Sequence, residues 1–271
     1  MIAFPNCKIN LGLRILRKRS DQFHDLETIF YPFPLYDALE LVSSASKEFS
    51  FTMSGLTIDG TEAENLCIRA YQLLQKDFPQ LPKASIHLHK TIPFGAGLGG
   101  GSADATWMLK LINDKYQLQL SAHDLHRYAL DLGSDCPFFI INRPCLATGR
   151  GEQLTEMDIN LAGYRIVLIH PGITVHTGKA FMEITPAIPA KPVREIVMQP
   201  VETWKKELLN DFEPVVFRQF PAIKEVKDEL YNKGAIYASM SGSGSSVYGI
   251  YKKEDQLSFD FPSSYLVKET Q

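Results

Sequence analysis

PFGAGLGGGSADA, residues 93–105, places five glycines within seven positions and runs directly into a helical pattern. Glycine loses more backbone entropy on folding than any other residue, so such a cluster indicates that the backbone must approach something closely. Alternating residues at 84–90 predict a strand before the cluster, and apolar residues at helical spacing predict a helix over 103–116. A glycine turn between a strand and the N-terminus of a helix is typical of a phosphate-binding loop.

Three kinds of phosphate-binding loop can be compared with this stretch. A Walker A loop requires a lysine before its last serine or threonine, and Gly101 occupies that position. Residues 95–100 fit a dinucleotide fingerprint, but Pro93 interrupts the passage from strand to turn, and a second helix follows where a strand is required. There remains a loop whose backbone N–H groups and helix N-terminus hold phosphates without a lysine, with Ser102 available to a phosphate or to Mg²⁺. A glycine turn that packs against a neighbour is the structural alternative.

The composition is that of an ordinary globular protein. Its 271 residues are 45% hydrophobic and 22% charged, and the formal net charge of −3 argues against a surface that binds nucleic acid. The four cysteines are scattered without metal-ligand spacing, which indicates reduced thiols. No apolar stretch reaches the roughly 20 residues that span a bilayer, and the N-terminus lacks a signal-peptide pattern. We therefore expect a cytoplasmic protein without a membrane partner.

The N-terminal stretch NCKINLGLRI, residues 6–15, alternates apolar and polar residues as a half-buried strand does. Lys8 and Asn10 then share the face that is turned away from the core. The basic residues at 17–19 belong to a polar turn over 17–22 and are interpreted as solvated, with contact to an anionic substrate as the alternative.

Further along the chain, helices alternate with strands and turns. We expect helices at 64–78, 121–133, 204–217 and 226–233, strands at 26–33 and 164–171, a hairpin over 144–154, and a strand, glycine turn and strand over 237–251. Ser121 and Asp124 fit a capping box at the start of the second of these helices. The composition shifts between about residues 151 and 164, so we expect domains at 1–153 and 154–271.

Three motifs together resemble the GHMP kinases, a family named for galactokinase, homoserine kinase, mevalonate kinase and phosphomevalonate kinase. They are the strand motif NCKINLGL at 6–13, the loop PFGAGLGGGS at 93–102 and the late glycine loop SGSGSS at 241–246. The resemblance implies a two-domain α+β fold. Its N-terminal ATP-binding domain is of the ribosomal-protein type, and its ferredoxin-like C-terminal domain contributes to the substrate site. ATP and Mg²⁺ are the implied cofactors.

Within the family, SDQFHDLETIF (20–30), LGSDCPFF (132–139) and ATGRGEQL (147–154) are similar to motifs of a particular group of members. These members phosphorylate the 2-hydroxyl of a cytidyl-diphosphate-linked methylerythritol, in the non-mevalonate (methylerythritol phosphate) route to isoprenoid precursors. The resemblance extends from residue 5 to beyond residue 245. It implies a small-molecule kinase, which we expect to be a monomer or weak homodimer that binds no nucleic acid.

Phosphoryl transfer to an alcohol requires a group that takes the hydroxyl proton, a cation that stabilises developing charge, and a cradle that holds ATP in line. The resemblance makes Asp135 the base, Lys8 the stabiliser of the anionic acceptor oxygen, and Asn10 a residue that orients the acceptor. Taken locally, Lys8 is an ordinary strand lysine and Asp135 a capping carboxylate, so these roles depend on the motifs. Cys136 has no activating pattern beside it and is interpreted as a packing residue.

The resemblance also implies contacts with the two nucleotides. Phe23 and His24 stand at the family's Tyr-His pair, which holds the cytosine, and Phe181 falls where a second aromatic lies against the same base. Phe23 keeps a face for stacking but lacks the hydroxyl of tyrosine. The implied ATP-binding residues are Pro93, Gly95, Gly97, Leu98, Gly99, Gly100, Gly101, Ser102, Gly242 and Asn65, which also fits an N-cap. Ser102 is the candidate ligand for Mg²⁺.

Two other functions remain open on the sequence. A GHMP kinase of the homoserine or mevalonate type would leave Phe23 and His24 without a base to hold, so cytidine-nucleotide binding separates it from the first expectation. A non-catalytic binding protein of the same fold is expected to lose the lysine or the aspartate, and this chain retains both.

Overall fold

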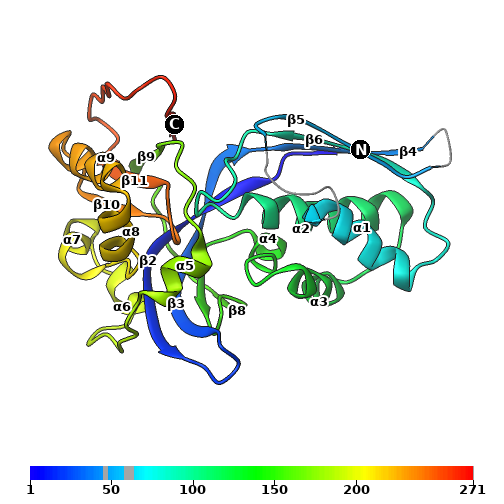
Figure 1. Ribbon diagram of the computed structural model, residues 1–271, viewed down its shortest axis with the longest axis horizontal. Helices are drawn as coiled ribbons and strands as arrows, with labels where there is room; N and C mark the ends of the chain where they lie inside the picture. Colours follow the sequence, from blue (N-terminus) through cyan, green and yellow to red (C-terminus); the bar gives the residue numbers. More distant parts are fainter. Residues whose placement is uncertain (45–47, 58–63, 271) are drawn as a thin grey trace. The chain divides into compact units, whose positions relative to one another are not determined.

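The computed structural model describes residues 1–44, 48–57 and 64–270. Its internal contacts group the chain into two compact units, and each contains helices and sheet, as expected for an α+β fold (Figure 1). The first unit consists of Met1–Cys7, Pro34–Phe94 and Gly99–Arg143, and the second of Lys8–Phe33, Gly95–Leu98 and Pro144–Gln271. The division of the sequence at residue 153 stays a prediction. No helix in the described ranges is long and apolar enough to cross a membrane.

The first unit is built on a four-stranded sheet whose strands lie in the order β1, β4, β6, β5. The strands are β1 (Ile2–Ala3), β4 (Ala38–Ser43), β5 (Ser50–Gly55) and β6 (Ala84–Lys90), so the strand predicted at 84–90 is confirmed. β4 pairs antiparallel with β1 and β6, whereas β5 runs parallel to β6. The alternating apolar residues of β4 and β6, among them Leu39 and Leu88, lie in the core.

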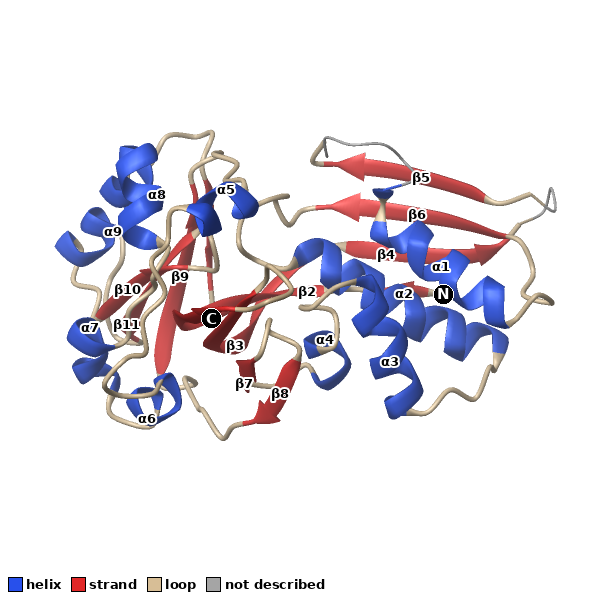
Figure 2. Cartoon of the chain, turned by 60° about the horizontal axis from the view of Figure 1, so that its bottom comes forward, coloured by secondary structure: helices blue, strands red, loops and turns tan. Residues whose placement is uncertain are grey.

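Helices cover one face of this sheet (Figure 2). They are α1 (Leu66–Asp77) and α2 (Gly100–Tyr116), with α3 (Ala122–Leu132) and α4 (Phe138–Ile141) packed against α2. Ser121 and Asp124 form the predicted capping box of α3. α2 begins within the glycine cluster, at Gly100 rather than at residue 103, and its Met108 and Ile112 complete the core against the sheet.

The second unit contains a four-stranded antiparallel sheet in the order β10, β11, β9, β12. Its strands are β9 (Tyr164–His170), β10 (Tyr237–Met240), β11 (Val247–Lys252) and β12 (Leu266–Glu269). Its helices are α5 (Thr177–Met182), α6 (Val193–Val197), the 3-10 turn η2 (Val201–Thr203), α7 (Trp204–Glu207), α8 (Glu213–Gln219) and α9 (Pro221–Asn232). Val167 and Ile169 of β9 share a core with Val216 of α8 and Val226 of α9. The strand, glycine turn and strand predicted over 237–251 are confirmed.

A second sheet, most of whose residues belong to this unit, carries the N-terminal motif. Its strands, in sheet order, are β2 (Asn6–Lys18), β3 (His24–Tyr36), β7 (Cys145–Thr148) and β8 (Gln153–Glu156), which confirms the hairpin over 144–154. The prediction that β2 is half-exposed is wrong, because Lys8 is 3% and Asn10 1% exposed. Residues 97 and 241 hydrogen-bond to that polar face.

The single helix predicted over 204–217 is also wrong. α7 ends at Glu207, residue 210 forms a bridge with Leu13 of β2, and α8 begins only at Glu213. Pro214 favours this break, because proline lacks the N–H that an interior helical residue donates and fits only in a first turn. The carboxylate of Asp211 accepts the backbone N–H of Ile15 at 2.8 Å, which ties the non-helical segment to β2.

Candidate active site

Lys8 is a buried residue of β2 whose ammonium group donates to oxygen atoms of Asn10 and Gly97. Its Nζ donates to Asn10 Oδ1 at 2.6 Å and to the Gly97 carbonyl oxygen at 3.2 Å. The same Nζ lies 4.8 Å from the centroid of the Phe30 ring. An ammonium group is stable away from water only when such groups replace its hydration. Lys8 is therefore part of a preorganised polar site and not a solvated strand lysine.

Asn10 is fixed by further hydrogen bonds from its side chain and its backbone. Its Nδ2 donates to Thr28 Oγ1 at 3.0 Å, and its backbone N–H donates to Ser241 Oγ at 3.2 Å. The Tyr248 hydroxyl donates to its carbonyl oxygen at 2.8 Å. Because Nδ2 is engaged on one side, the amide oxygen is directed to Lys8 on the other.

The loop at 95–98 and the late glycine loop are in direct contact, through one side-chain and one backbone hydrogen bond. Ser241 Oγ donates to the Gly97 carbonyl at 2.9 Å, and the Ser246 N–H donates to the Ala96 carbonyl at 3.1 Å. A β-carbon on Gly97, whose φ is +75°, would lie 1.9 Å from the Ser241 carbonyl oxygen. One on Gly242 would lie 3.1 Å from the Gly97 carbonyl oxygen. The absence of a side chain at Gly97 therefore lets the backbone of the late glycine loop pack against it.

The other glycines of the cluster differ from one another in what surrounds them. A β-carbon on Gly95 would lie 2.9 Å from Thr174 Cγ2, and one on Gly100 would lie 2.7 Å from Ile92 Cγ2. On Gly101 the nearest atom would be a Leu66 methyl carbon at 3.8 Å, which is ordinary contact. Close packing thus explains why Gly95 and Gly100 are glycines. At Gly101 the packing of the first unit leaves room for a side chain, so it does not explain the glycine.

The N-terminus of α2 presents backbone that no side chain caps. Gly99 is the N-cap with a φ of 68°, and the first turn carries no acidic residue. Unpaired N–H groups and the partial positive charge at a helix N-terminus favour an anion. Ser102 lies in this first turn, where its carbonyl accepts the Thr106 hydroxyl at 2.9 Å.

Asp135 lies in a turn that α2 and α4 hold. Its carbonyl accepts the Phe138 N–H at 3.3 Å, and the carbonyl of the next residue, Cys136, accepts the Thr106 hydroxyl at 2.9 Å. The side chain of Asp135 is half-buried. Burial raises the pKa of the Cys136 thiol to about 11, so this cysteine is protonated at neutral pH, as a packing residue is.

A buried ion-pair cluster at the end of β6 was missed by the sequence analysis. Lys90 Nζ donates to Asp104 Oδ2 at 2.8 Å and also to Asp37 Oδ2, and Asp37 accepts the Ile92 N–H at 2.9 Å. Burial, with the nearby Asp37 carboxylate, raises the pKa of Asp104 to about 7 in spite of the neighbouring ammonium. The available signal was Lys90 itself, a charged residue at a core-facing position of β6.

The predicted cytosine-binding residues form two separate contacts. His24 and Phe181 are stacked, with ring centroids 5.0 Å apart and planes 14° apart, and Phe181 also meets the Phe212 ring edge-on at 4.8 Å. Phe23 is 52% exposed, and the Arg150 guanidinium lies 4.8 Å from the centroid of its ring. Burial, with the charge of Lys18, lowers the pKa of His24, so its ring is neutral at neutral pH.

Three further predicted ATP-binding residues have roles in the fold. The Asn65 side chain accepts the Cys67 N–H at 2.9 Å and so caps α1. Leu98 is buried, and its carbonyl accepts the backbone N–H of Lys8 at 3.0 Å. Pro93 is half-buried in the passage from β6 to the loop.

The basic cluster at 17–19 is engaged within its own hairpin. Arg17 and Arg19 both pair with Asp25, and Arg19 also pairs with Asp21 at 2.9 Å. These contacts favour the interpretation as a polar turn over contact with an anionic substrate.

The predicted site residues are divided between the two units. The second unit brings together Lys8, Asn10, Gly97, Leu98 and Gly242, and it also contains Gly95, Phe23, His24 and Phe181. The first unit contains Asp135, Asn65, Pro93 and Gly99–Ser102. A lysine ammonium beside a glycine loop, a loop-borne carboxylate and an uncapped helix N-terminus are the parts that a phosphotransferase uses.

Comparison with known proteins identifies the class. The model of the GHMP kinases N terminal domain matches residues 65–143, and that of the GHMP kinases C terminal domain matches residues 194–259. The chain belongs to the GHMP kinase family. A relative along its whole length is the 4-diphosphocytidyl-2-C-methyl-D-erythritol kinase of Bacteroides fragilis, 50% identical over 268 residues, which are 98% of this chain and 97% of the relative.

Solved structures agree with this family. A crystal structure of 4-(cytidine 5'-diphospho)-2C-methyl-D-erythritol kinase is similar with a TM-score of 0.78 and 32% identity, covering 92% of this chain and 90% of that one. The homoserine kinase of Cytophaga hutchinsonii is similar with a TM-score of 0.64 and 16% identity, covering 92% of this chain and 85% of that one. At that identity the second likeness concerns the fold alone.

Proposed function

We propose that this chain transfers the terminal phosphoryl group of ATP to the 2-hydroxyl of 4-diphosphocytidyl-2-C-methyl-D-erythritol, in the methylerythritol phosphate route to isoprenoid precursors. Relatives that are about half identical over nearly the full length carry this substrate in their names. The structural observation that carries the proposal is the buried ammonium of Lys8, held at the Gly97 carbonyl of the glycine loop and beside Asn10.

In this proposal Asp135 and Lys8 act on the acceptor hydroxyl. Asp135 takes the proton of the hydroxyl group as its oxygen attacks the phosphorus atom, and the ammonium of Lys8 stabilises the negative charge that develops on that oxygen. Asn10 orients the acceptor through its amide. The burial of Lys8 supports its role, because a charge acts more strongly on a reacting atom where water is excluded.

ATP is proposed to place its phosphates at the first turn of α2, over Gly99–Ser102, with Asn65 near the adenine. The uncapped N–H groups of that turn support this placement, as does Gly101, where a β-carbon would meet nothing closer than 3.8 Å. The Ser102 hydroxyl is a hard oxygen ligand. Such a ligand suits Mg²⁺, which usually takes only one or two ligands from the protein and others from substrate phosphates. When bound with ATP, Mg²⁺ supplies neutralisation of the phosphate charge.

The cytidine end of the acceptor is proposed to bind at His24, Phe181 and Phe23. The stacked pair of His24 and Phe181 supports this because a ring already fixed by a neighbour loses little freedom when a base stacks on it. Phe23 offers an exposed ring face close to a guanidinium, which suits a base that is joined to a diphosphate. The protein is proposed to work in the cytoplasm as a monomer or weak homodimer, without nucleic acid or membrane partners.

The test is ADP release by the purified protein with ATP and a panel of acceptors. 4-Diphosphocytidyl-2-C-methyl-D-erythritol, mevalonate and homoserine are compared at equal concentration. We expect turnover with the cytidyl compound and at most background with the other two. Turnover with mevalonate or homoserine alone would replace the proposal with another kinase activity, and no turnover with any would favour a non-catalytic binding protein.

A further inference from the structure

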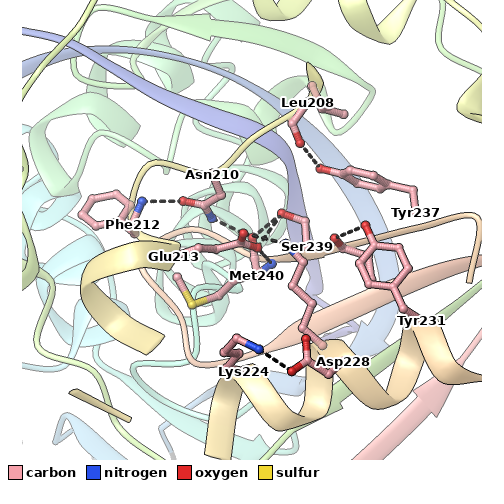
Figure 3. A network of polar contacts seen from close by, with 12 residues as sticks. Leu208, Asn210, Phe212, Glu213, Lys224, Asp228, Tyr231, Tyr237, Ser239 and Met240 are labelled. Atoms are coloured by element: carbon pink, nitrogen blue, oxygen red, sulfur yellow. Dashed lines mark hydrogen bonds and ion pairs between the residues drawn. The ribbon is translucent and has the colours of Figure 1, made fainter. Parts of the chain in front are cut away.

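Asn210, between α7 and α8, is a buried residue whose amide is paired on both sides (Figure 3). It is 3% exposed, and its Nδ2 donates to the carbonyl oxygens of Met240 at 2.7 Å and Gly242 at 2.8 Å. Its Oδ1 accepts the backbone N–H of Phe212 at 2.9 Å. One side chain therefore holds both neighbours of Ser241 and, on its other side, the residue that precedes α8.

The first arm of contacts leads from Asn210 to Lys8. Ser241, between the two carbonyls that Asn210 binds, donates its hydroxyl to the Gly97 carbonyl at 2.9 Å and accepts the Asn10 N–H at 3.2 Å. Gly97 and Asn10 in turn each provide an oxygen atom to which the Lys8 ammonium donates. A shift of the Ser241 peptide would therefore displace both of these oxygen atoms.

The second arm leads from Asn210 to the aromatic stack. The Phe212 N–H is bound by Asn210, and the Phe212 ring meets the Phe181 ring edge-on, with centroids 4.8 Å apart and planes 83° apart. Phe181 is the ring on which His24 stacks. An edge-to-face contact fixes the orientation of a ring as well as its position.

Glu213 fastens the same strand end from the first turn of α8 (Figure 3). Its Oε1 accepts the Met240 N–H at 2.9 Å and the Ser239 hydroxyl at 3.2 Å, while its Oε2 accepts Lys227 Nζ at 2.6 Å. The N–H and the carbonyl of Met240 are thus both bound by the segment 210–213. The segment 210–213 therefore fixes the position of Met240, the residue that precedes the late glycine loop.

We propose that Asn210 is a positioning residue that sets both halves of the acceptor site. It acts on the Lys8 and Asn10 pair through Ser241, and on the Phe181 and His24 stack through Phe212. The inference rests on the proposed function. A displacement of about 1 Å at reacting groups can cost about 100-fold in rate, so one buried amide that holds both halves has a large effect on turnover.

Four variants separate the two arms. Ser241→Ala removes the hydroxyl of the first arm, and Phe212→Leu removes the aromatic ring of the second. Asn210→Ala removes the amide whose hydrogen bonds begin both arms. Ile223→Ala, in α9, removes buried side-chain volume from the same core but no hydrogen bond of the first arm and no ring of the second, so it is a control for lost stability. kcat and the KM for each substrate are measured by ADP release, at a temperature where circular dichroism shows each variant folded.

We expect Ser241→Ala to lower kcat by about 10-fold or more while the acceptor KM stays within about twofold. Phe212→Leu should raise the acceptor KM by about 2- to 10-fold at unchanged kcat. Asn210→Ala should show both effects, whereas Ile223→Ala should lower the Tm and keep the kinetic constants of the wild type.

An Asn210→Ala variant that loses stability like Ile223→Ala but keeps wild-type kcat and KM would overturn the proposal. If Asn210→Ala does not fold, wild-type constants in both single-arm variants would overturn it equally. The wild-type enzyme, measured in parallel, tests the proposed function separately. A wild type that is inactive on the cytidyl acceptor refutes that function and this inference with it, whereas an active wild type with unaffected variants refutes the positioning role alone.

Discussion

The Ser241 hydroxyl donates to the Gly97 carbonyl over 2.9 Å, joining two glycine loops that lie 144 residues apart in the sequence. A β-carbon on Gly97 would lie 1.9 Å from the Ser241 carbonyl oxygen, and the φ of +75° at Gly97 disfavours any other residue. The glycine cluster therefore serves two purposes. At Gly97 it lets two loops of one unit meet, and at Gly101 it leaves backbone exposed for a ligand in the proposed function.

Gly101→Ala tests the phosphate cradle without disturbing the protein. The new methyl group meets nothing closer than 3.8 Å, and alanine favours a helix over glycine by up to about 1 kcal/mol, so the Tm should stay equal or rise. The affinity for a non-hydrolysable ATP analogue should fall by about tenfold or more, because the methyl group occupies space proposed for phosphate oxygens. Calorimetric titration measures it, and an unchanged affinity would return Gly101 to a purely structural role.

Gly97→Ala is the contrasting variant at the loop contact. Its methyl group collides with backbone, and its φ is unfavourable, so this variant should lose stability in thermal denaturation. A Tm equal to that of the wild type would show that the two loops do not hold each other as described.

Lys8→Met tests electrostatic stabilisation. The substitution keeps an unbranched apolar stem but removes the ammonium that Asn10 Oδ1 and the Gly97 carbonyl accept. kcat should fall by about 10²- to 10³-fold, as when one stabilising donor is removed, while the ATP analogue still binds. Lys110→Met is the matched control, because Lys110 Nζ also donates to backbone carbonyls, at 2.7 Å and 3.3 Å, and Lys110 is not among the proposed site residues. Equal kcat in both variants would exclude Lys8 from the chemistry.

Phe23 gives a test of base recognition, since its side chain can be removed without opening the core. Phe23→Ala should weaken CDP binding by about 5- to 100-fold, the range of one lost stacking contact, with ATP affinity and Tm nearly unchanged. Phe23→Tyr should retain binding. Tyr36→Ala, which removes an equally exposed aromatic ring elsewhere, should leave CDP affinity intact. If Phe23→Ala weakens ATP and CDP alike, Phe23 is not specific to the cytidine.

Asp104 makes stability depend on pH in a defined direction. Its pKa is raised from 3.8 to about 7 by burial, so between these values the folded protein keeps a proton that the unfolded chain releases. This contribution to stability is full below about pH 4 and is lost as pH rises through about 7. Asp104→Asn should therefore gain Tm relative to the wild type as pH is raised from about 4 to 8. A pH-independent difference for Asp104→Asn would contradict the assignment.

The pattern of residues along the sequence predicted those parts of the site that are formed by residues close together in the sequence. The alternation at 6–15 placed Lys8 and Asn10 on one face of a strand, and the pair does meet at 2.6 Å. The same alternation could not tell that this face is covered, because the covering residue, Ser241, comes from the far end of the chain. Glycine composition likewise could not distinguish Gly100, where a β-carbon would collide with Ile92, from Gly101, where it would meet nothing closer than 3.8 Å.

The helical reading of 204–217 failed for a related reason. Apolar spacing continues across Asn210 and Phe212, yet the backbone there is used by tertiary contacts with β2 and the late glycine loop. Pro214 was the one local signal in the sequence that one helix ends before this position and another begins near it. The non-helical segment between α7 and α8 contacts both β2 and the late glycine loop, and the periodic pattern did not reveal these contacts.

The most direct test of the central claim is the product of the purified enzyme incubated with ATP and 4-diphosphocytidyl-2-C-methyl-D-erythritol, followed by phosphorus and carbon NMR. The wild type should yield a phosphomonoester on carbon 2. Asp135→Asn should still bind ATP but form the product at a rate lower by about 10²- to 10⁴-fold. Phosphate on another hydroxyl, no product from the wild type, or an undiminished rate from a folded Asp135→Asn variant would contradict it.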